Sequence, residues 1–377
     1  MDERPIELGA PRLGEAEKQA LIEVIDDGWV TMGDRVRRFE RRFAELHGVE
    51  DAVAVSSATA ALQLSLAAFD VGAGHEVLVP SLTFVATANV VVHAGATPVF
   101  VDVEGVDRPH MSIVDARAKI SSRTRAIFVM HYGGYGIDLA PWRRLADEFG
   151  LLLLEDAAHA TGLSGIVGTT SDAASFSFFT NKNMTTAEGG MLLARDPERL
   201  RRARLMRAHG MTSSTLDRDR GHAYGYDVVE CGHNFRMDEL RGAMGLVQIE
   251  RLLEWNERRR ELTDIYRSEL REFAPEAIVP FSAGHPTSGH LLPVVLPRGT
   301  DRARVAASMR AARVQTSVHY PPVHRFEFYE RLGGPTSLPY TEEFCARELT
   351  LPLHPGLDAA DVNRVVKTLC EALGADR

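Results

Sequence analysis

Short apolar runs of strand length recur through the first half of the chain. They occupy Ala52–Val55, Glu76–Pro80, Thr97–Val103, Arg125–Met130, Leu151–Glu155, Ala173–Phe178 and Met191–Ala194. Helical patterns lie between several of these runs, at 60–69, 113–120 and 141–149, and another precedes the first run at 15–27. Strands that alternate with helices predict a mostly parallel sheet covered by helices on both faces. We therefore expect an α/β fold whose large domain is built on these seven strands.

The pattern changes after Met237, where a charged helical stretch runs from Glu239 to about Phe273. Beyond it the pattern predicts a smaller α+β C-terminal domain, with strands at 291–296 and 315–319 and helices at 302–312 and 359–373. We assign residues 1–238 to the large domain and residues 239–377 to the connecting helix and the small domain.

One stretch of the large domain, residues 208–223, has mixed charge and few apolar positions. Such a segment has little apolar surface to bury and is typical of a surface loop. We expect a loop there that becomes ordered only with substrate or a partner subunit.

The net charge of the chain indicates which macromolecules it does not favour as nonspecific partners. Lys and Arg number 43 against 52 Asp and Glu, a net charge of −9, which disfavours nonspecific binding to nucleic acid or to an acidic membrane surface. No apolar stretch reaches the ~20 residues of a transmembrane helix, and the first seven residues lack the apolar core of a signal peptide. The three cysteines lie far apart. These features predict a cytoplasmic protein that binds neither nucleic acid nor membrane.

Lys182 stands in an unusual context for a lysine. It follows the apolar run that ends at Phe178 and precedes a turn that ends at Gly190, and the hydroxyl of Ser177 lies five residues before it. A lysine that is desolvated at a strand end attacks carbonyl groups and forms the Schiff base that holds pyridoxal phosphate. Taken alone, a lysine is far more often a solvated surface residue, and it is the neighbouring segments that favour the Schiff base.

Two further segments carry candidate chemistry. The run Leu151-Leu-Leu-Leu-Glu-Asp-Ala-Ala-His159 is typical of a buried parallel strand that ends at a cofactor crevice. Asp156 at its end either pairs with a protonated pyridine nitrogen or caps a following helix. The small residues Ser56-Ser-Ala-Thr-Ala60 precede a helical pattern, and such a turn either holds a phosphate at the helix N-terminus or is a helix cap without a ligand.

These signals occur together, and in this order, in one family. The chain resembles the DegT/StrS-type sugar aminotransferases, which are fold type I pyridoxal-phosphate enzymes of the aspartate aminotransferase superfamily. The resemblance runs nearly end to end, through Gly28–Gly33, Pro80–Thr87, Pro98–Val103, Glu155–Ala160, Ser177–Gly190, Gly232–Met237, His319–His324 and Leu351–Pro355. It implies the fold type I architecture, with pyridoxal 5′-phosphate as the cofactor.

The resemblance implies a role for each matching residue around the cofactor ring. Lys182 would form the Schiff base and move a proton between the substrate Cα and the cofactor C4′. Asp156 would pair with the pyridine nitrogen, and His159 would lie near the phenolic oxygen. Phe84 would stack on the ring. Without the family context, we would predict that Phe84 is a core residue and that His159 is a structural histidine.

The resemblance also implies where the cofactor phosphate binds. Thr59, Ala60 and Ser177 would hold it, joined by Asn234 from a second subunit. This assignment makes the active site a shared property of a homodimer.

The segment from His319 through Tyr320 to His324 lies near the active site in the resembled family. We therefore name these three residues as candidate substrate contacts, with plain structural use as the alternative for the two histidines. The histidines form no short pair on a helix, and neighbouring prolines place them in extended segments. We expect no metal site.

Two turns depart from the family pattern. The first reads Ser-Ala-Thr where many relatives have Ser-Gly-Thr, so that Ala58 must adopt ordinary backbone dihedrals. In the second, Ala187 takes the place of a glycine. A left-handed backbone at Ala58 would cost about 1–2 kcal/mol. We expect both replacements to be tolerated.

Lysine at position 182 favours transamination, because the dehydratase branch of the family has histidine there. We predict transfer of an amino group from L-glutamate to a nucleotide-linked keto-deoxysugar. The alternatives are amination of an inosose-type keto-cyclitol, a pyridoxal-phosphate-dependent sugar dehydratase or lyase, and a catalytically silent cofactor-binding protein on the same scaffold.

Overall fold

The protein is described by a computed structural model that covers residues 4–334 and 336–374. Its main feature is a seven-stranded sheet in the order β1-β7-β6-β5-β4-β2-β3. The strands are β1 (Val53–Val55), β2 (Glu76–Pro80), β3 (Thr97–Val101), β4 (Thr124–Met130), β5 (Leu152–Asp156), β6 (Ala173–Ser177) and β7 (Gly190–Ala194). Neighbouring strands run parallel except where β7 pairs with β1 and β6. The predicted α/β fold with a mostly parallel seven-stranded sheet is confirmed.

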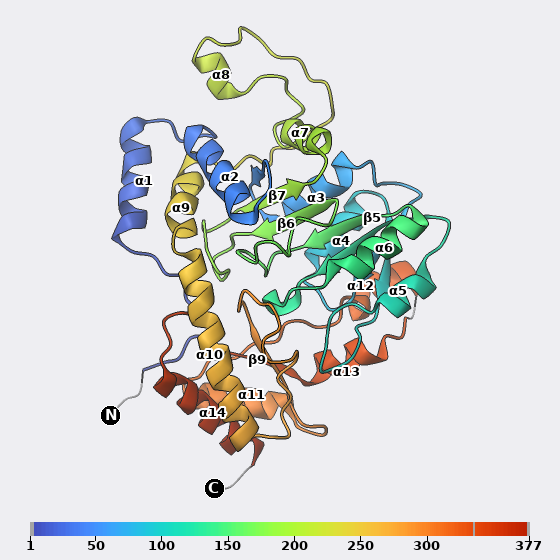
Figure 1. Ribbon diagram of the computed structural model, residues 1–377, viewed down its shortest axis with the longest axis vertical. Helices are drawn as coiled ribbons and strands as arrows, with labels where there is room; N and C mark the ends of the chain where they lie inside the picture. Colours follow the sequence, from blue (N-terminus) through green and yellow to red (C-terminus); the bar gives the residue numbers. More distant parts are fainter. Residues whose placement is uncertain (1–3, 335, 375–377) are drawn as a thin grey trace.

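Helices cover both faces of this sheet (Figure 1). They are α3 (Ala58–Ala68) and α4 (Ala86–His93) on one face, and α5 (Ile113–Lys119) and α6 (Leu139–Phe149) on the other. Along β4, Ala126 and Phe128 pack into the apolar cluster that contains α3 and α4. Ile127 and Val129 point the opposite way, toward Trp142 of α6. The apolar run of this strand therefore serves two buried faces at once.

Three helices pack together beside the β1 edge of the sheet. They are α1 (Glu15–Asp27), α2 (Asp34–His47) and α9 (Glu239–Ile249). The buried carboxylate of Glu239 joins two of them. It accepts the N–H groups of Gly33 and Val36 at Oε1 and of Arg35 at Oε2, each at 2.9 Å. These N–H groups at the start of α2 have no acceptor within the helix, so that Glu239 supplies both the acceptors and the favourable charge.

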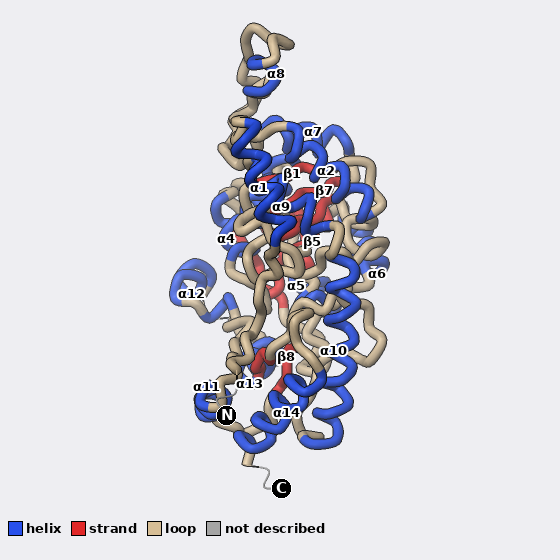
Figure 2. Tube along the Cα trace, turned by 90° about the vertical axis from the view of Figure 1, so that its left-hand side faces the viewer, coloured by secondary structure: helices blue, strands red, loops and turns tan. Residues whose placement is uncertain are grey.

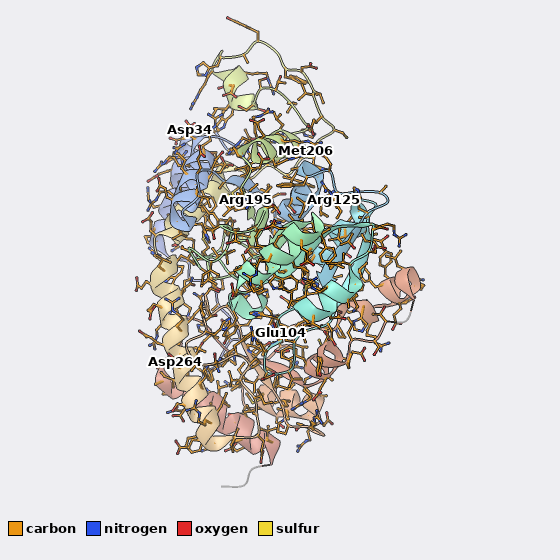
Figure 3. The ribbon with its side chains drawn as sticks, turned by 45° about the vertical axis from the view of Figure 1, so that its right-hand side comes forward. Asp34, Glu104, Arg125, Arg195, Met206 and Asp264 are labelled. Carbon is orange, nitrogen blue, oxygen red and sulfur yellow. The ribbon has the colours of Figure 1, made fainter. Side chains whose placement is uncertain are left out.

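An arm projects from the end of the molecule opposite the two termini (Figure 2). It follows α7 (Pro197–Met206) and includes the short helix α8 (Thr215–Asp219). Figure 3 labels Met206 and Asp34 at the base of this arm. Ion pairs of Arg37 with Asp217 and of Arg220 with Asp34 tie the arm to α2. The expectation of a loop over 208–223 is therefore wrong in part, because five of these residues form α8.

A second group of elements follows the sheet. It contains α10 (Leu252–Phe273), β8 (Leu292–Val295), α11 (Arg302–Ala311), α12 (Glu327–Gly333), α13 (Pro339–Arg347), β9 (Glu348–Leu351) and α14 (Ala359–Leu373), with β8 and β9 antiparallel. The long helix predicted from Glu239 to Phe273 is in fact two helices, since α9 ends at Ile249 and α10 begins at Leu252. No helix among the described residues has both the length and the apolarity needed to cross a membrane.

The strand predicted at 315–319 does not form. Val314 and Ser317 make only single bridges, to Ile6 and Thr350. The N–H of His319 donates to the side-chain carboxylate of Glu348 at 2.9 Å, and not to a neighbouring strand. A side-chain acceptor therefore takes the place of the ladder that a strand would need.

The N-terminal segment belongs with the C-terminal elements. Ile6 exchanges backbone hydrogen bonds with Arg313 and Gln315 at 2.9 Å each, and its side chain is buried in a separate apolar core formed by α10, β8, α11, β9 and α14. The predicted division at residue 238 therefore fails for this segment. The rest of the division stays a prediction, and its outermost residues, 1–3 and 375–377, lie outside the described part of the chain.

Replacing Glu239 with Gln should lower the free energy of unfolding by about 2 kcal/mol. The amide keeps one acceptor but turns a donor toward the N–H of Arg35, and it removes the negative charge at the start of α2. Urea denaturation of both proteins measures the difference. Glu250→Gln is the matched control, because Glu250 is exposed and pairs with the exposed Arg42. Equal losses in the two variants would contradict the capping role.

Candidate active site

A pocket of about 390 Å³ opens where the parallel strands end. Met130, Asp156 and Ser177, the last residues of β4, β5 and β6, line it together with the start of α3. The carboxyl ends of parallel strands are the usual place for a ligand in an open α/β sheet. The lining residues are Ser57, Ala58, Thr59, Leu62, Phe84, Ala86, Met130, Asp156, Ala158, His159, Ser177, Phe179, Asn181, Lys182, Glu188, Gly189, His319 and Tyr320.

Lys182 projects from the loop that joins β6 to β7. Its backbone N–H donates to the carbonyl of Phe179 at 2.9 Å, which fixes the turn. Burial of the amine lowers the pKa of Lys182 to about 8, against an opposing attraction from the Asp156 carboxylate. The amine is therefore neutral far more often than that of a surface lysine, as a nucleophile toward an aldehyde must be.

Asp156 is buried at the end of β5. Its Oδ2 accepts the hydroxyl of Thr87 at 2.5 Å, and its Oδ1 accepts the N–H of Ala158 at 3.1 Å. Burial raises the pKa of Asp156, although both hydrogen bonds and the charge of Lys182 favour the ionised form. Turns, and no helix, follow Asp156 through residue 170, so the alternative of a helix cap is wrong.

Thr87 was not among the candidate residues, although the segment Pro80–Thr87 was part of the resemblance. Its hydroxyl also lies 2.9 Å from that of Thr83. Two threonines four residues apart at the start of a helix are a signal that sequence inspection could have used.

His159 lies against the pocket in a defined tautomer. Its Nδ1 accepts the N–H of Gly133 at 3.2 Å, so that Nε2 carries the proton and donates to Tyr320 Oη at 2.9 Å. Burial, with the charge of Lys182 second, holds the pKa of His159 well below its usual value. Phe84 lines the same pocket with 54% of its surface exposed, and its ring centroid is 5.8 Å from that of Tyr320. An aromatic face is thus free to cover a bound ring.

The start of α3 can receive an anion. Ser57 is the N-cap, and among the described residues no acceptor takes the N–H groups of Ala58 and Thr59. Gly190 makes this turn possible, because a Cβ there would lie 2.6 Å from the carbonyl carbon of Ser57. Ala58 begins the helix with ordinary dihedrals, as expected. Free N–H groups at a helix N-terminus are suited to bind a phosphate.

The four residues predicted to bind the phosphate do not all line the pocket. Thr59 and Ser177 line the pocket, whereas Ala60 is buried behind it and donates its N–H to Ser57 Oγ at 3.1 Å. The side chain of Asn234 is exposed and lies outside the pocket of its own chain. Within one chain, therefore, two of the four candidate residues reach the pocket.

The segment from His319 to His324 divides in the same way. His319 and Tyr320 line the pocket, but His324 does not. Its Nδ1 lies 2.7 Å from Ser81 Oγ and its Nε2 lies 3.1 Å from the Glu342 carboxylate. Both ring nitrogens of His324 are thus committed to structural contacts, and the expectation that it touches substrate is corrected.

Ala187 has a left-handed backbone, with φ of +65°. A residue with a Cβ costs about 1–2 kcal/mol in this region. Thr185 Oγ1 accepts its N–H at 2.9 Å, and its carbonyl accepts the Thr180 hydroxyl at 3.2 Å. These contacts stabilise the loop that carries Lys182 in a backbone conformation that is unfavourable for alanine.

The comparisons with known proteins agree with this geometry. The family model of the DegT/DnrJ/EryC1/StrS aminotransferases matches residues 11–370. The chain belongs to this family. A relative in this DegT/DnrJ/EryC1/StrS family is the spore coat polysaccharide biosynthesis protein SpsC of Bacillus subtilis (strain 168), which is 35% identical over 97% of each chain.

Solved structures are similar as well. Spr1654 of Streptococcus pneumoniae in its PLP form is 27% identical, with a TM-score of 0.90, over 99% of each chain. DesI in the presence of its TDP-sugar product is 31% identical, with a TM-score of 0.87, over 98% of this chain and 93% of that one. The protein is thus a pyridoxal-phosphate-dependent sugar aminotransferase of the DegT/DnrJ/EryC1/StrS family.

The pocket fits pyridoxal phosphate. It joins an amine of lowered pKa, a buried carboxylate, an exposed aromatic face and free N–H groups at a helix start. These groups correspond to the aldehyde, the pyridine nitrogen, the ring face and the phosphate of the cofactor. In the described ranges, no cluster of three or more His, Cys, Asp or Glu side chains is arranged to hold a metal ion.

Capture of pyridoxal phosphate by the cofactor-free protein should accelerate with pH and level off near pH 8, because only the neutral amine attacks the aldehyde. An amine with a pKa of about 8 is about one-tenth neutral at pH 7, whereas a lysine of ordinary pKa is neutral in less than about 0.1% of molecules. Stopped-flow absorbance measures the rate. Lys182→Ala should show no covalent capture. A rate that still rises tenfold per pH unit at pH 9 would contradict the lowered pKa.

Replacing Thr87 with Val should weaken cofactor binding by about tenfold, since a hydrogen bond to a charged group contributes about 1.5–3 kcal/mol and part of this is lost on binding. Without the hydroxyl the pKa of Asp156 rises further. Asp156 is then ionised less often and pairs less with the protonated pyridine nitrogen. Fluorescence titration with pyridoxal phosphate measures the affinity. Thr161→Val is the matched control, because Thr161 is buried and its hydroxyl has no hydrogen-bond partner within the described ranges. An unchanged affinity in Thr87→Val would remove Thr87 from this role.

Proposed function

We propose that the enzyme transfers the amino group of L-glutamate to a nucleotide-linked keto-deoxysugar. The observation that carries this proposal is the convergence of the Lys182 amine, of lowered pKa, and the Asp156 carboxylate in one pocket. The similarity to DesI in the presence of its TDP-sugar product supports a nucleotide-linked acceptor. Bound pyridoxal phosphate supplies an electron sink for the substrate Cα.

The residues that line the pocket have different proposed roles. Lys182 would attach the cofactor and carry a proton between the substrate Cα and the cofactor C4′. An amine with a pKa of about 8 can both accept and donate this proton at neutral pH. Asp156, which accepts the hydroxyl of Thr87, would pair with the protonated ring nitrogen. His159, which is neutral, would lie near the phenolic oxygen, and the exposed ring of Phe84 would cover the ring face.

We further propose a homodimer in which each copy completes the other's phosphate site. Thr59 and Ser177 hold the phosphate from one side of the pocket, and Asn234 of a second copy reaches it from the other. Asn234 lies where the arm rejoins the body, through a bridge to Ala208. The arm exposes Tyr224 and Tyr226, by 102% and 58%, which a single copy leaves uncovered.

The cytoplasmic location and the alternative reactions remain predictions from the sequence. The keto-cyclitol alternative would use the same cofactor pocket, so that only the substrate separates it from our proposal. The dehydratase alternative is disfavoured by Lys182, because the dehydratase branch of the family has histidine at this position.

Adding L-glutamate to the loaded enzyme without an acceptor should replace the absorbance of the pyridoxal form with that of the pyridoxamine form. A nucleotide-linked keto-deoxysugar should then restore the first spectrum and yield an amino sugar, measured by mass spectrometry. An inosose serves as the parallel acceptor. Turnover of the inosose alone would establish the keto-cyclitol aminotransferase. Elimination products without consumption of glutamate would establish the dehydratase or lyase.

A further inference from the structure

Glu348 is a buried carboxyl group without a cationic partner. It is the first residue of β9, its exposed fraction is 0%, and it forms no ion pair with any described residue. The guanidinium of Arg302 lies nearby but donates to the backbone carbonyls of Cys345 and Glu348. A buried carboxyl group in such a place is costly, which calls for a reason beyond packing.

The carboxyl group of Glu348 is connected to the pocket through two hydrogen bonds. Its Oε2 accepts the backbone N–H of His319 at 2.9 Å, and its Oε1 lies 2.5 Å from Thr350 Oγ1. Thr350 Oγ1 in turn lies 2.8 Å from His319 Nδ1. The hydroxyl of Tyr132 donates to the carbonyl of His319 and holds the same peptide from the other side. Glu348 and Thr350 therefore control one nitrogen of the His319 ring.

The other nitrogen of that ring is available to the pocket. His319 lines the pocket with Lys182, and its Nε2 has no hydrogen-bond partner among the described residues. Burial, with the charge of Lys182 second, lowers the pKa of His319 to about 4, so that the ring is neutral near pH 7. The variable that remains is the tautomer, which decides whether Nε2 donates or accepts.

The protonation of Glu348 fixes this choice. An ionised carboxylate only accepts, so that the Thr350 hydroxyl must donate to it, His319 Nδ1–H donates to Thr350, and Nε2 presents a lone pair to the pocket. A protonated carboxyl donates from Oε1 to Thr350, whose hydroxyl then donates to His319 Nδ1. Nε2 carries the proton in that case and presents a donor.

We propose that Glu348 is a positioning residue of this active site that sets, through Thr350, whether His319 offers a hydrogen-bond donor or an acceptor to the substrate. Below the titration of Glu348 the ring donates to an acceptor such as a keto or phosphate oxygen. Above it the ring accepts from a donor such as a sugar hydroxyl. The chemistry of the ligand that the pocket favours therefore changes without any change in the charge of His319.

The surroundings of Glu348 place its titration in an accessible range. Burial raises the pKa of Glu348 to about 8, opposed by its bonds from Thr350 and the His319 N–H and by the charge of Arg302. The other titratable groups that face it are Tyr132, Tyr320 and Cys345, whose pKa values burial raises. These three groups stay neutral through the range in which Glu348 titrates, and none of them competes for its proton.

The test reads the tautomer of His319 directly. Two-bond ¹H–¹⁵N correlation spectra of the ¹⁵N-histidine-labelled, cofactor-loaded enzyme distinguish Nδ1–H from Nε2–H, and His319→Gln assigns the signal. The Nε2–H tautomer should fall from about nine-tenths at pH 7 to about one-tenth at pH 9. Glu348→Gln should hold the Nε2–H tautomer at every pH, because its amide carbonyl accepts the His319 N–H and its NH₂ group donates to Thr350.

Thr350 supplies an independent pair of variants. Thr350→Ser keeps the hydroxyl and should keep the pH-dependent change of tautomer, whereas Thr350→Val should abolish it. In activity assays of the native enzyme, KM for the keto acceptor should rise as Glu348 ionises, because His319 Nε2 then no longer donates to the keto oxygen. Glu348→Gln should remove this rise while changing kcat little. A His319 tautomer that stays constant from pH 7 to pH 9 in the native enzyme, or that titrates unchanged in Glu348→Gln, would overturn the proposal. Since the signal comes from the ring itself, the outcome does not depend on the identity of donor or acceptor.

Discussion

The burial of one amine opposite one carboxylate, at the edge where parallel strands end, is the constraint on which the rest of the site depends. Lys182 and Asp156 each lose water in this place, and burial alone would drive both toward their neutral forms. Their mutual attraction and the hydroxyl of Thr87 oppose that drive. The result for Lys182 is an amine with a pKa of about 8, which can gain and lose a proton at neutral pH.

The antiparallel strand β7 brings the two ends of the site together. It pairs with β6, whose end leads into the lysine loop, and with β1, whose end leads into the turn at the start of α3. Val55 stands opposite Gly190 in this register, and the missing side chain of Gly190 lets the turn approach closely. One strand thus sets the spacing between the amine and the anion site, although more than a hundred residues separate them in sequence.

Periodicity and motif order predicted the sheet, the covering helices α3, α5 and α6 and the residues that lie at strand ends, because these features are local, whereas the covering helix α4 was missed. Contacts made by remote segments could not be read in the same way. Nothing in the sequence indicates that Ser81 and Glu342 occupy both nitrogens of His324, or that Glu348 replaces a strand partner for His319. Glu239 and Glu348 look like ordinary acidic residues of a helix and a strand until the chain folds and buries them.

The place of Ile6 in the C-terminal core has a consequence for how the chain is made. During synthesis the N-terminal segment leaves the ribosome first, yet its backbone partners, Arg313 and Gln315, are translated some three hundred residues later. The sheet that contains the cofactor pocket can be complete before those partners exist. The segment around Ile6 therefore stays without these partners while the large sheet folds, and it can pair only after Gln315 has been made.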